Sequence, residues 1–331
     1  MKLAAALGLM IGAALAAWLL ASYGFGRILN LLSHVGWLGL AAVIGFHAIQ
    51  VVFSAAGWRA VAGATVPRPG LREFALLRLI REGVNNLLPV GQVGGDFVAT
   101  RLLQRRGVKP TAAIAGMVCD VTMELVTQIA FTLMGLGLLV LTVGGSDIVR
   151  YAIGGVGVAV TLAAAFLAVQ WFGPVRMIET ALMRLGRAIG WHGAGKVEGL
   201  QDALLALYRA PRQLAWSAAW HFACWMLGGV EVCLALHFLG TDAPLATGLV
   251  IESLGQASKA AGFVVPGALG VQEGGYIVVC GLFGLPPDVA IALSLVKRLR
   301  EIALGLPGIA AWRWLEREPS PALSHSSGAV R

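Results

Sequence analysis

Residues 85–96 read NNLLPVGQVGGD, and a related stretch, GFVVPGALGVQE, stands at residues 262–273. The two prolines, Pro89 and Pro266, are 177 positions apart (266 − 89). Each copy has two apolar residues before its proline, a glycine-rich segment with one carboxylate after it, and a second proline that opens a long apolar segment. The same shift, without a gap, aligns Asp96 with Glu273, Gly107 with Gly284, Pro110 with Pro287, Ala113 with Ala290 and Glu124 with Glu301.

The composition is that of a membrane protein. Of the 331 residues, 58% are hydrophobic and 13% are charged, and the mean hydropathy is +0.79, whereas about 25% of a soluble domain is charged. The net charge of +8 does not indicate a nucleic-acid partner, because the arginines cluster in some loops and are absent from others, as the positive-inside rule describes. The four cysteines lie in apolar segments without metal-ligand spacing, so we predict no disulfide, metal site or cofactor.

Six segments approach the roughly 20 apolar residues that a membrane-spanning helix needs. They are residues 3–23, 35–58, 111–143, 151–172, 214–239 and 288–312. The first lacks a signal-peptide cleavage site, so we predict a retained span. Two further segments, 59–109 and 245–283, contain the repeated stretch, and a proline and several glycines interrupt each of them. We predict that each forms a re-entrant helical hairpin, whose irregular backbone must be satisfied by protein or by a wet cavity.

The charge bias orients these segments. If neither hairpin crosses the membrane, the arginine-rich segments 59–109 and 174–212 and the tail fall on one side, and the arginine-poor segments fall on the other. Both termini are then predicted to be cytoplasmic, in a bacterial inner membrane, and the two hairpins enter from opposite sides. Two copies of one motif in opposite orientation form an inverted repeat, as in many transporters that bind substrate near the midplane.

The predicted fold is an all-α polytopic membrane protein with about six transmembrane helices and two re-entrant hairpins in an inverted repeat. Residues 1–316 would form a single membrane domain, and the Ser/Pro/Ala-rich tail, 317–331, would be disordered. Within that domain, we expect repeat halves at about 35–172 and 213–314, joined by a cytoplasmic connector at 173–212.

Ionisable residues inside predicted spans are candidates for function. Asp120 and Glu124 are four apart and share one helix face, as do Lys297 and Glu301. Asp120 and Lys297 each follow a helix-opening proline by ten residues, which is roughly 15 Å of helix or about half the hydrocarbon thickness. We therefore predict an ion pair from Asp120 to Lys297, or to Arg298, across the centre. Such a pair would either hold helices together or help a polar headgroup to pass.

The remaining polar candidates lie in or near the two helix breaks. Asp96 and Glu273 would cap helix starts or take part in gating and proton transfer. Arg298, beside Arg300, would either pair locally or bind an anion. His221 and Glu231 stand isolated, and a backbone carbonyl is expected to satisfy the histidine. We predict no catalytic residue, and a substrate path formed by Asn85, Asn86, Pro89, Gln92, Asp96, Asp120, Glu124, Lys259, Pro266, Gln272, Glu273, Lys297, Arg298 and Glu301.

The motifs NLLP at 86–89, VVPG at 264–267, GVQEG at 270–274, and the Lys-Arg and Pro-Gly pairs of the last span resemble the lysylphosphatidylglycerol synthase transmembrane-region family. The resemblance covers nearly the whole chain, and residues 265–276 and 293–301 are most similar to the subfamily linked to hopanoid biosynthesis. The resemblance implies a region through which aminoacylated phosphatidylglycerol is flipped. The separate aminoacyl transferase domain of the founding synthases has no room here, so synthase activity is not expected. Residues 90–96, VGQVGGD, depart from an Arg-Gly-Glu-like segment of many relatives, so no role of Gln92 or Asp96 is carried over.

These observations favour a lipid translocase that moves a hopanoid or related lipid between leaflets. No nucleotide-binding loop or hydrolase motif is present, so we do not expect an enzyme. The alternatives are a membrane enzyme or accessory subunit of hopanoid or polyisoprenoid biosynthesis, with Asp120, Glu124 and Glu273 as acid/base groups, and a scaffold. The expected partners are membrane lipids, with a homo-oligomer and lipid-biosynthesis enzymes as further possibilities.

Overall fold

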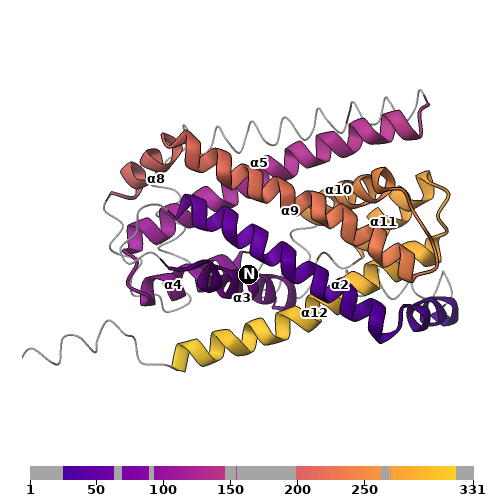
Figure 1. The fold of residues 1–331 in the computed structure, drawn as a ribbon, viewed down its shortest axis with the longest axis horizontal. Coiled ribbons are helices and arrows are strands. Elements are labelled where there is room, and N and C mark those ends of the chain that lie inside the picture. The colour runs from indigo at the N-terminus through magenta and orange to yellow at the C-terminus, as the bar shows by residue number, and fades with distance from the viewer. Residues whose placement is uncertain are drawn as a thin grey trace, which may run out of the picture.

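The computed structural model describes residues 25–62, 69–88, 93–145, 154, 199–261, 268 and 270–317. Within these ranges the chain is helical and contains no strand. The helices, shown in Figure 1, are α2 (Phe25–Val61), α3 (Leu71–Leu87), α4 (Gly94–Arg105), α5 (Pro110–Thr142), α8 (Leu200–Tyr208), α9 (Pro211–Phe238), α10 (Leu245–Ala261), α11 (Val271–Leu282) and α12 (Pro287–Arg317).

Three of these helices are long and apolar enough to cross a membrane, so the chain is an all-α membrane protein. They are Asn30–Val61 within α2, α5 and α9, with mean hydropathies of 1.9, 2.0 and 1.4. They coincide with predicted spans at 35–58, 111–143 and 214–239. Helix α12 covers the predicted span at 288–312 but is not among the three. The predicted spans at 3–23 and 151–172, except residue 154, lie outside the described residues, as do most of the connector and all but the first residue of the tail.

Prolines and one glycine shape the long helices. α5, α9 and α12 each begin at a proline, whose missing N–H would be unpaired there in any case. α2 bends at Gly36, where φ is 58°, a left-handed conformation that glycine adopts without a Cβ penalty. Trp37, the next residue, is 88% exposed. The bend therefore separates a short initial segment from the long apolar part of α2.

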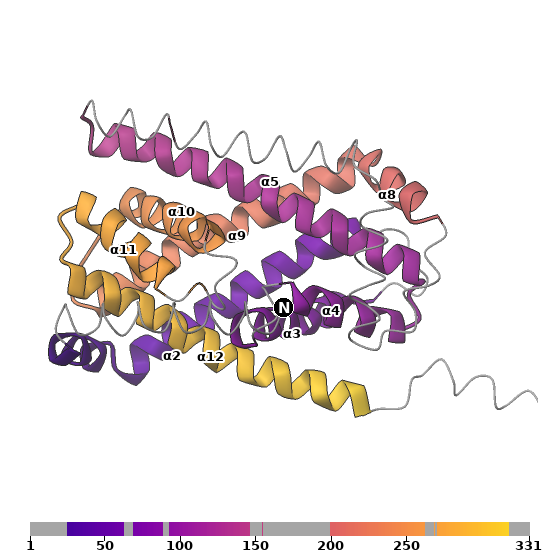
Figure 2. The same cartoon turned by 180° about the vertical axis from the view of Figure 1, so that it is seen from behind.

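The helix bounds follow the 177-residue shift found in the sequence. α4 and α11 are both 12 residues long, and the shift carries Gly94 onto Val271 at their starts. The packing repeats as well, because α3 contacts α12 as α10 contacts α5, and α2 contacts α3 as α9 contacts α10. α2 packs against α9, and these two helices run in opposite directions, as do α5 and α12 (Figures 1 and 2). Two sets of four helices, α2–α5 and α9–α12, are thus packed against each other.

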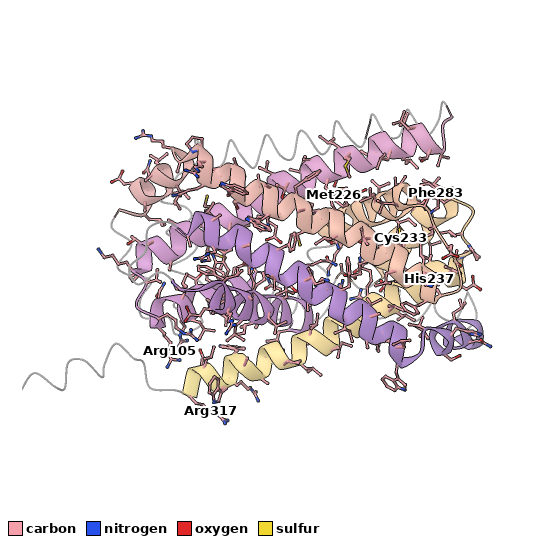
Figure 3. The ribbon with its side chains drawn as sticks, in the orientation of Figure 1. Arg105, Met226, Cys233, His237, Phe283 and Arg317 are labelled. Atoms are coloured by element: carbon pink, nitrogen blue, oxygen red, sulfur yellow. The ribbon has the colours of Figure 1, made fainter. Side chains whose placement is uncertain are left out.

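Two arginines lie at the same end of the molecule. Arg105, at the end of α4, donates a hydrogen bond to the carbonyl oxygen of Leu315 at 2.9 Å. Figure 3 places Arg105 and Arg317 at one end of the molecule and His237 and Phe283 at the other. The ends of α4 and α12 are therefore joined on the basic side.

Two contacts between the helix sets are equivalent in the repeat but differ in their residues. Between α3 and α12, a Cβ on Gly83 would lie 2.6 Å from the carbonyl oxygen of Gly305, and one on Gly308 would lie 2.6 Å from that of Leu79. These helices touch through backbone, and we call this contact the glycine seam. Between α5 and α10 the shift puts Gln128 at the position of Gly305 and Gln256 at that of Leu79. We call this second contact the glutamine seam.

Candidate functional site

A cavity of about 370 Å³ lies between the two helix sets and is lined by α2, α3, α4, α5, α9, α10 and α12. Its lining is rich in charge, with four Lys or Arg and five Asp or Glu side chains. The cations are Arg78, Arg81, Lys259 and Arg300, and the anions are Glu82, Asp96, Glu124, Glu252 and Glu301. Ionisable groups at this density beside apolar helices are costly in a membrane and mark substrate or ion pathways.

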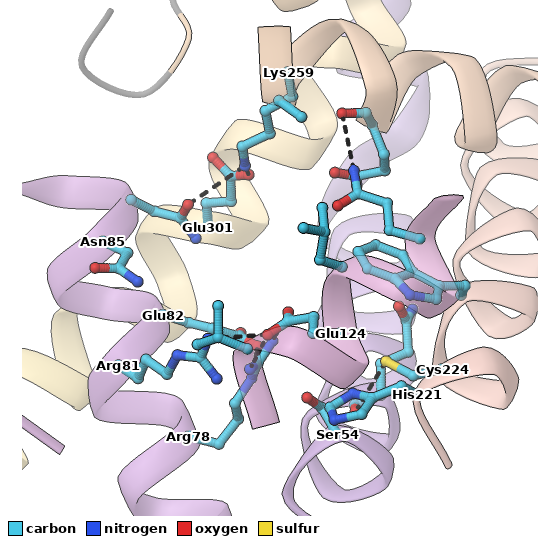
Figure 4. Close-up of a pocket in the computed structure, with 18 of the residues that line it drawn as sticks. Ser54, Arg78, Arg81, Glu82, Asn85, Glu124, His221, Cys224, Lys259 and Glu301 are labelled. Carbon is cyan, nitrogen blue, oxygen red and sulfur yellow. Dashed lines mark hydrogen bonds and ion pairs between the residues drawn. The ribbon is translucent and has the colours of Figure 1, made fainter. Parts of the chain in front are cut away.

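The first helix set contributes an ion-pair network centred on two arginines of α3. Arg78 binds Glu124 of α5 through both of its Nη atoms, at 3.1 and 2.7 Å, and its Nε donates to Glu82 at 2.9 Å. Arg81 donates to Glu124 and to Asp120 of α5, both at 2.9 Å. Because Arg78 and Arg81 are three apart on α3, one helix face presents both of them to α5. Figure 4 shows Arg78, Arg81 and Glu82 gathered beside Glu124.

Two further contacts tie this network to neighbouring helices. Arg81 Nε pairs with Asp96 at the start of α4. His221 of α9 places its Nε2 atom 2.9 Å from Asp120 Oδ1, and both side chains are buried. Asp120 is therefore held between α3 and α9. Removing one partner of such a buried ion pair strongly destabilises the folded protein, because the other charge stays buried without its partner.

The second helix set contributes an equivalent network centred on α12. Lys297 pairs with Glu252 of α10, and Arg300 pairs with Glu231 of α9. Glu301 accepts a hydrogen bond from Lys259 of α10 at 2.7 Å. Ion pairs thus bind α12 to α10, as they bind α5 to α3. The sign of the charge is reversed at one matching position, where α12 has Lys297 and α5 has Asp120, and is kept at another, where Glu301 matches Glu124.

The predicted pair between Asp120 and Lys297 is wrong. Asp120 is bound by Arg81 and His221, and Lys297 is bound by Glu252. Asp120 and Lys297 match under the repeat, but both are buried, and each is bound to a different helix, α3 or α10. A buried charge needs its partner in direct contact, and the hairpin helix provides it.

The expectations for His221 and Glu231 are also wrong. His221 binds the carboxylate of Asp120, whereas a backbone carbonyl was expected. Glu231 is not isolated, because it contacts His47 at 2.9 Å and pairs with Arg300 and Gln50. Both residues lie on α9, and their partners lie on α2, α5 and α12. These helices are distant in sequence, and only the fold brings them together.

The structure separates the predicted path residues into three groups. Asn85, Asn86, Asp96, Glu124, Lys259 and Glu301 line the cavity. Asp120, Gln272, Glu273, Lys297 and Arg298 lie outside its lining, although Asp120 and Lys297 each bind a residue that lines it. Pro89, Gln92 and Pro266 lie outside the described residues.

Contacts define what several of these residues do. Asn85 Oδ1 accepts a hydrogen bond from the Gly95 backbone N–H at 2.7 Å and so satisfies the start of α4. Lys259 Nζ reaches Asn86 Oδ1 at 3.4 Å, which links the two hairpins. Glu273 accepts from the Gly270 N–H at 2.6 Å and pairs with Arg298 at 2.8 Å. Its geometry fits the capping role, which helix starts favour for a carboxylate.

Sequence reasoning missed the α3 residues Arg78, Arg81 and Glu82, the α2 residues His47 and Gln50, and Glu252. The signal for the α3 group was present, because the amphipathic segment 71–82 is too charged to span and its charges recur at helical spacing. His47 and Gln50 gave no such signal, since each is a single polar residue in an apolar run.

The cavity can hold a polar or charged group. No three His, Cys, Asp or Glu side chains of the described residues are arranged to hold a metal ion. Two buried donor atoms of lining residues, Ser54 Oγ and Arg300 Nε, have no hydrogen-bond partner among the described residues. Such donors favour a ligand with hydrogen-bond acceptors.

The fold and site define a helical membrane protein with a charged cavity between two helix sets. A model of the family described as lysylphosphatidylglycerol synthase TM region matches residues 5–308. The chain belongs to that family, which confirms the predicted family and places it among membrane proteins of lipid metabolism or transport. No curated protein matches the chain, and the hopanoid-linked subfamily stays a prediction.

Proposed function

We propose that the protein is a translocase that moves a polar lipid between the leaflets of a bacterial inner membrane. The observation that carries the proposal is the charged cavity between helix sets that contain the three candidate spans. The lipid headgroup would cross through this cavity while the hydrocarbon tails stay in the bilayer. Lining charges on both sets would replace water around the headgroup, which the hydrocarbon core does not supply.

The proposed topology has six spans and two re-entrant hairpins in an inverted repeat, with both termini cytoplasmic. The matching helix bounds, the repeated contacts and the opposite directions of α2 and α9 support this arrangement. The clustering of Arg105 and Arg317 at one end supports a cytoplasmic assignment for that end.

The glutamine seam is the proposed entrance for the headgroup. Gln128 Nε2 donates to the backbone carbonyl of Gln256 at 3.4 Å, and both side chains line the cavity. The equivalent glycine seam is closed by backbone contact. Polar amide side chains can bind a passing headgroup, whereas glycines packed against backbone leave no space for one.

The substrate class follows from the lining. A charged cavity suits a phospholipid, or a hopanoid that carries a polar extension, better than a bare hydrocarbon. The alternative function, an enzyme or accessory subunit of hopanoid or polyisoprenoid synthesis, requires free acid/base groups. Asp120 and Glu124 are bound in ion pairs and Glu273 caps a helix, so the geometry favours translocation.

The test is lipid transfer in vesicles. Purified protein is placed in liposomes with labelled phosphatidylglycerol or a polar hopanoid in one leaflet, and the sidedness and chemical identity of the label are followed. We expect wild-type protein to move one of these lipids unchanged, and Glu301→Gln to slow the transfer by about tenfold or more, since it weakens the Lys259 contact. The control is Asp242→Asn, at a side chain that is 88% exposed.

Two results would overturn the proposal. One is folded wild-type protein that moves none of the lipids, and the other is conversion of the label into a different lipid. Chemical conversion would establish the enzyme.

A further inference from the structure

His47 of α2 has contacts that a single protonation state cannot all satisfy. Its Nδ1 atom is 2.9 Å from Glu231 Oε2 and also 2.9 Å from Arg300 Nη1. A guanidinium only donates hydrogen bonds and a carboxylate only accepts them. With a proton on Nδ1, the ring donates a hydrogen bond to Glu231 but cannot accept one from Arg300. Without that proton, Nδ1 accepts a hydrogen bond from Arg300 but cannot donate one to Glu231.

The other ring nitrogen completes the arrangement. Nε2 lies 3.5 Å from Glu82 Oε2 on α3, so a proton on Nε2 suits both forms of the ring. The neutral ring then links Glu82 to Arg300, and the imidazolium links Glu82 to Glu231. Proton uptake therefore changes the partner of Nδ1 without requiring the ring to turn. His221 contrasts with this, because its Nε2 atom lies against the carboxylate of Asp120.

Charged groups surround His47 on every side that is packed against it. α3 contributes Glu82 and Arg78, and α9 contributes Glu231. α12 contributes Arg300, with Lys297 and Glu301 beside it, and α5 contributes Glu124 through its pair with Arg78. His47 itself is 16% exposed. A charge gained here is poorly screened by water and acts strongly on its neighbours.

Arg300 connects this histidine to the cavity. It is 5% exposed and lines the cavity, and its Nε has no hydrogen-bond partner among the described residues. When Nδ1 carries a proton, Arg300 Nη1 also loses an acceptor. Arg300 Nη1 keeps its pair with Glu231, Arg300 Nε has no partner among the described residues, and the site has gained one positive charge.

We propose that His47 is a proton-binding site whose occupancy opens Arg300 to the phosphate of an anionic lipid headgroup. The proton comes from water and adds to Nδ1, and no covalent bond to the lipid forms. The imidazolium transfers its Nδ1 hydrogen bond to Glu231, and the phosphate accepts hydrogen bonds from Arg300. Proton and headgroup therefore bind together. This inference deepens the proposed translocase, whose substrate would be an anionic phospholipid.

The test measures proton uptake when lipid binds. Full-length protein in neutral detergent and weak buffer is titrated with dioctanoyl phosphatidylglycerol, and a pH indicator reports the protons taken up. We expect about one proton per bound lipid, and an affinity that falls by up to about tenfold per pH unit as the pH rises above the range in which His47 is protonated. Dioctanoylglycerol, which lacks phosphate, should cause no uptake.

Three variants separate the role of His47 from folding. His47→Gln should bind lipid without proton uptake and without pH dependence. His47→Lys carries a fixed charge and should bind at high pH as tightly as wild type does at low pH, again without uptake. His237→Gln, at an exposed histidine of α9, should behave as wild type. Circular dichroism and gel filtration establish that each variant is folded.

The outcomes are distinct from those of the transfer assay. Uptake that persists in folded His47→Gln, or its absence in wild type, would overturn the inference even if lipid transfer occurs. Proton uptake without any lipid transfer would support the proton-binding site and refute the proposed translocase. Glycerol phosphate tests whether the site binds a free phosphate ester that carries no lipid tails. Uptake with it would show that phosphate alone is recognised, and uptake with the lipid only would assign the site to lipid.

Discussion

The glycine seam and the glutamine seam occupy equivalent places in the repeat, yet one is closed and the other lines the cavity. At the glycine seam, Gly83 and Gly305 bring the backbones of α3 and α12 into contact. At the glutamine seam, the residue equivalent to Gly305 is Gln128, and its side chain lines the cavity. Of two matching contacts between the helix sets, one is thus closed by backbone, and the other is the proposed entrance. The difference lies in side-chain size at matching positions.

The two helix sets also differ in the sign of one buried charge. Asp120 and Lys297 match under the repeat, and each is bound by the first helix of its own hairpin, through Arg81 and Glu252. Opposite signs at matching positions give the two hairpins distinct electrostatic surroundings while the helix contacts stay equivalent.

Reversing one buried charge should have the largest effect. Lys297→Glu places a second carboxylate beside Glu252, and we expect a loss of about 3–5 kcal/mol in the free energy of unfolding. The double variant with Glu252→Lys restores an opposite pair and should recover most of the loss. Chemical denaturation in detergent measures both. If the double variant is no more stable than the single one, the pairing does not stabilise the second half.

Filling the glycine seam should have the next largest effect. Gly83→Val puts a side chain where backbone of α12 already lies, and overpacking of this kind costs about 1–3 kcal/mol. Gly281→Val is the matched control, because a Cβ at Gly281 meets nothing within 4 Å. Thermal unfolding should show a loss only for Gly83→Val. Equal losses would mean that the glycine seam is not tightly closed in the working protein.

Making the glutamine seam apolar should affect transfer more than stability. Gln256→Leu introduces the residue found at the equivalent position, Leu79, and removes an amide from the proposed entrance. We expect lipid transfer to slow by about tenfold, which corresponds to about 1.4 kcal/mol in the barrier. Gln213→Leu, at an exposed position of α9, is the control. Unchanged transfer by folded Gln256→Leu would place the entrance elsewhere.

The sequence predicted helix positions better than contacts. A repeat in the chain fixes which segments are alike, and proline and glycine positions fix where helices begin and break, so α4, α5, α11 and α12 were predictable. It does not fix which residues touch, since equivalent positions can lie apart, as Asp120 and Lys297 do. The partners of His221 and Glu231 come from other helices and required the three-dimensional fold.

The bend at Gly36 also has an electrical consequence. Exposed Trp37 follows the bend, and tryptophan favours the membrane–water interface. His47 stands ten residues further along α2, about 15 Å deeper and near the middle of a hydrocarbon layer of about 30 Å. A proton that reaches His47 would therefore cross about half of the transmembrane voltage, worth about 1.2 kcal/mol at 100 mV. Proton occupancy, and with it headgroup binding, would respond to membrane potential as well as to pH.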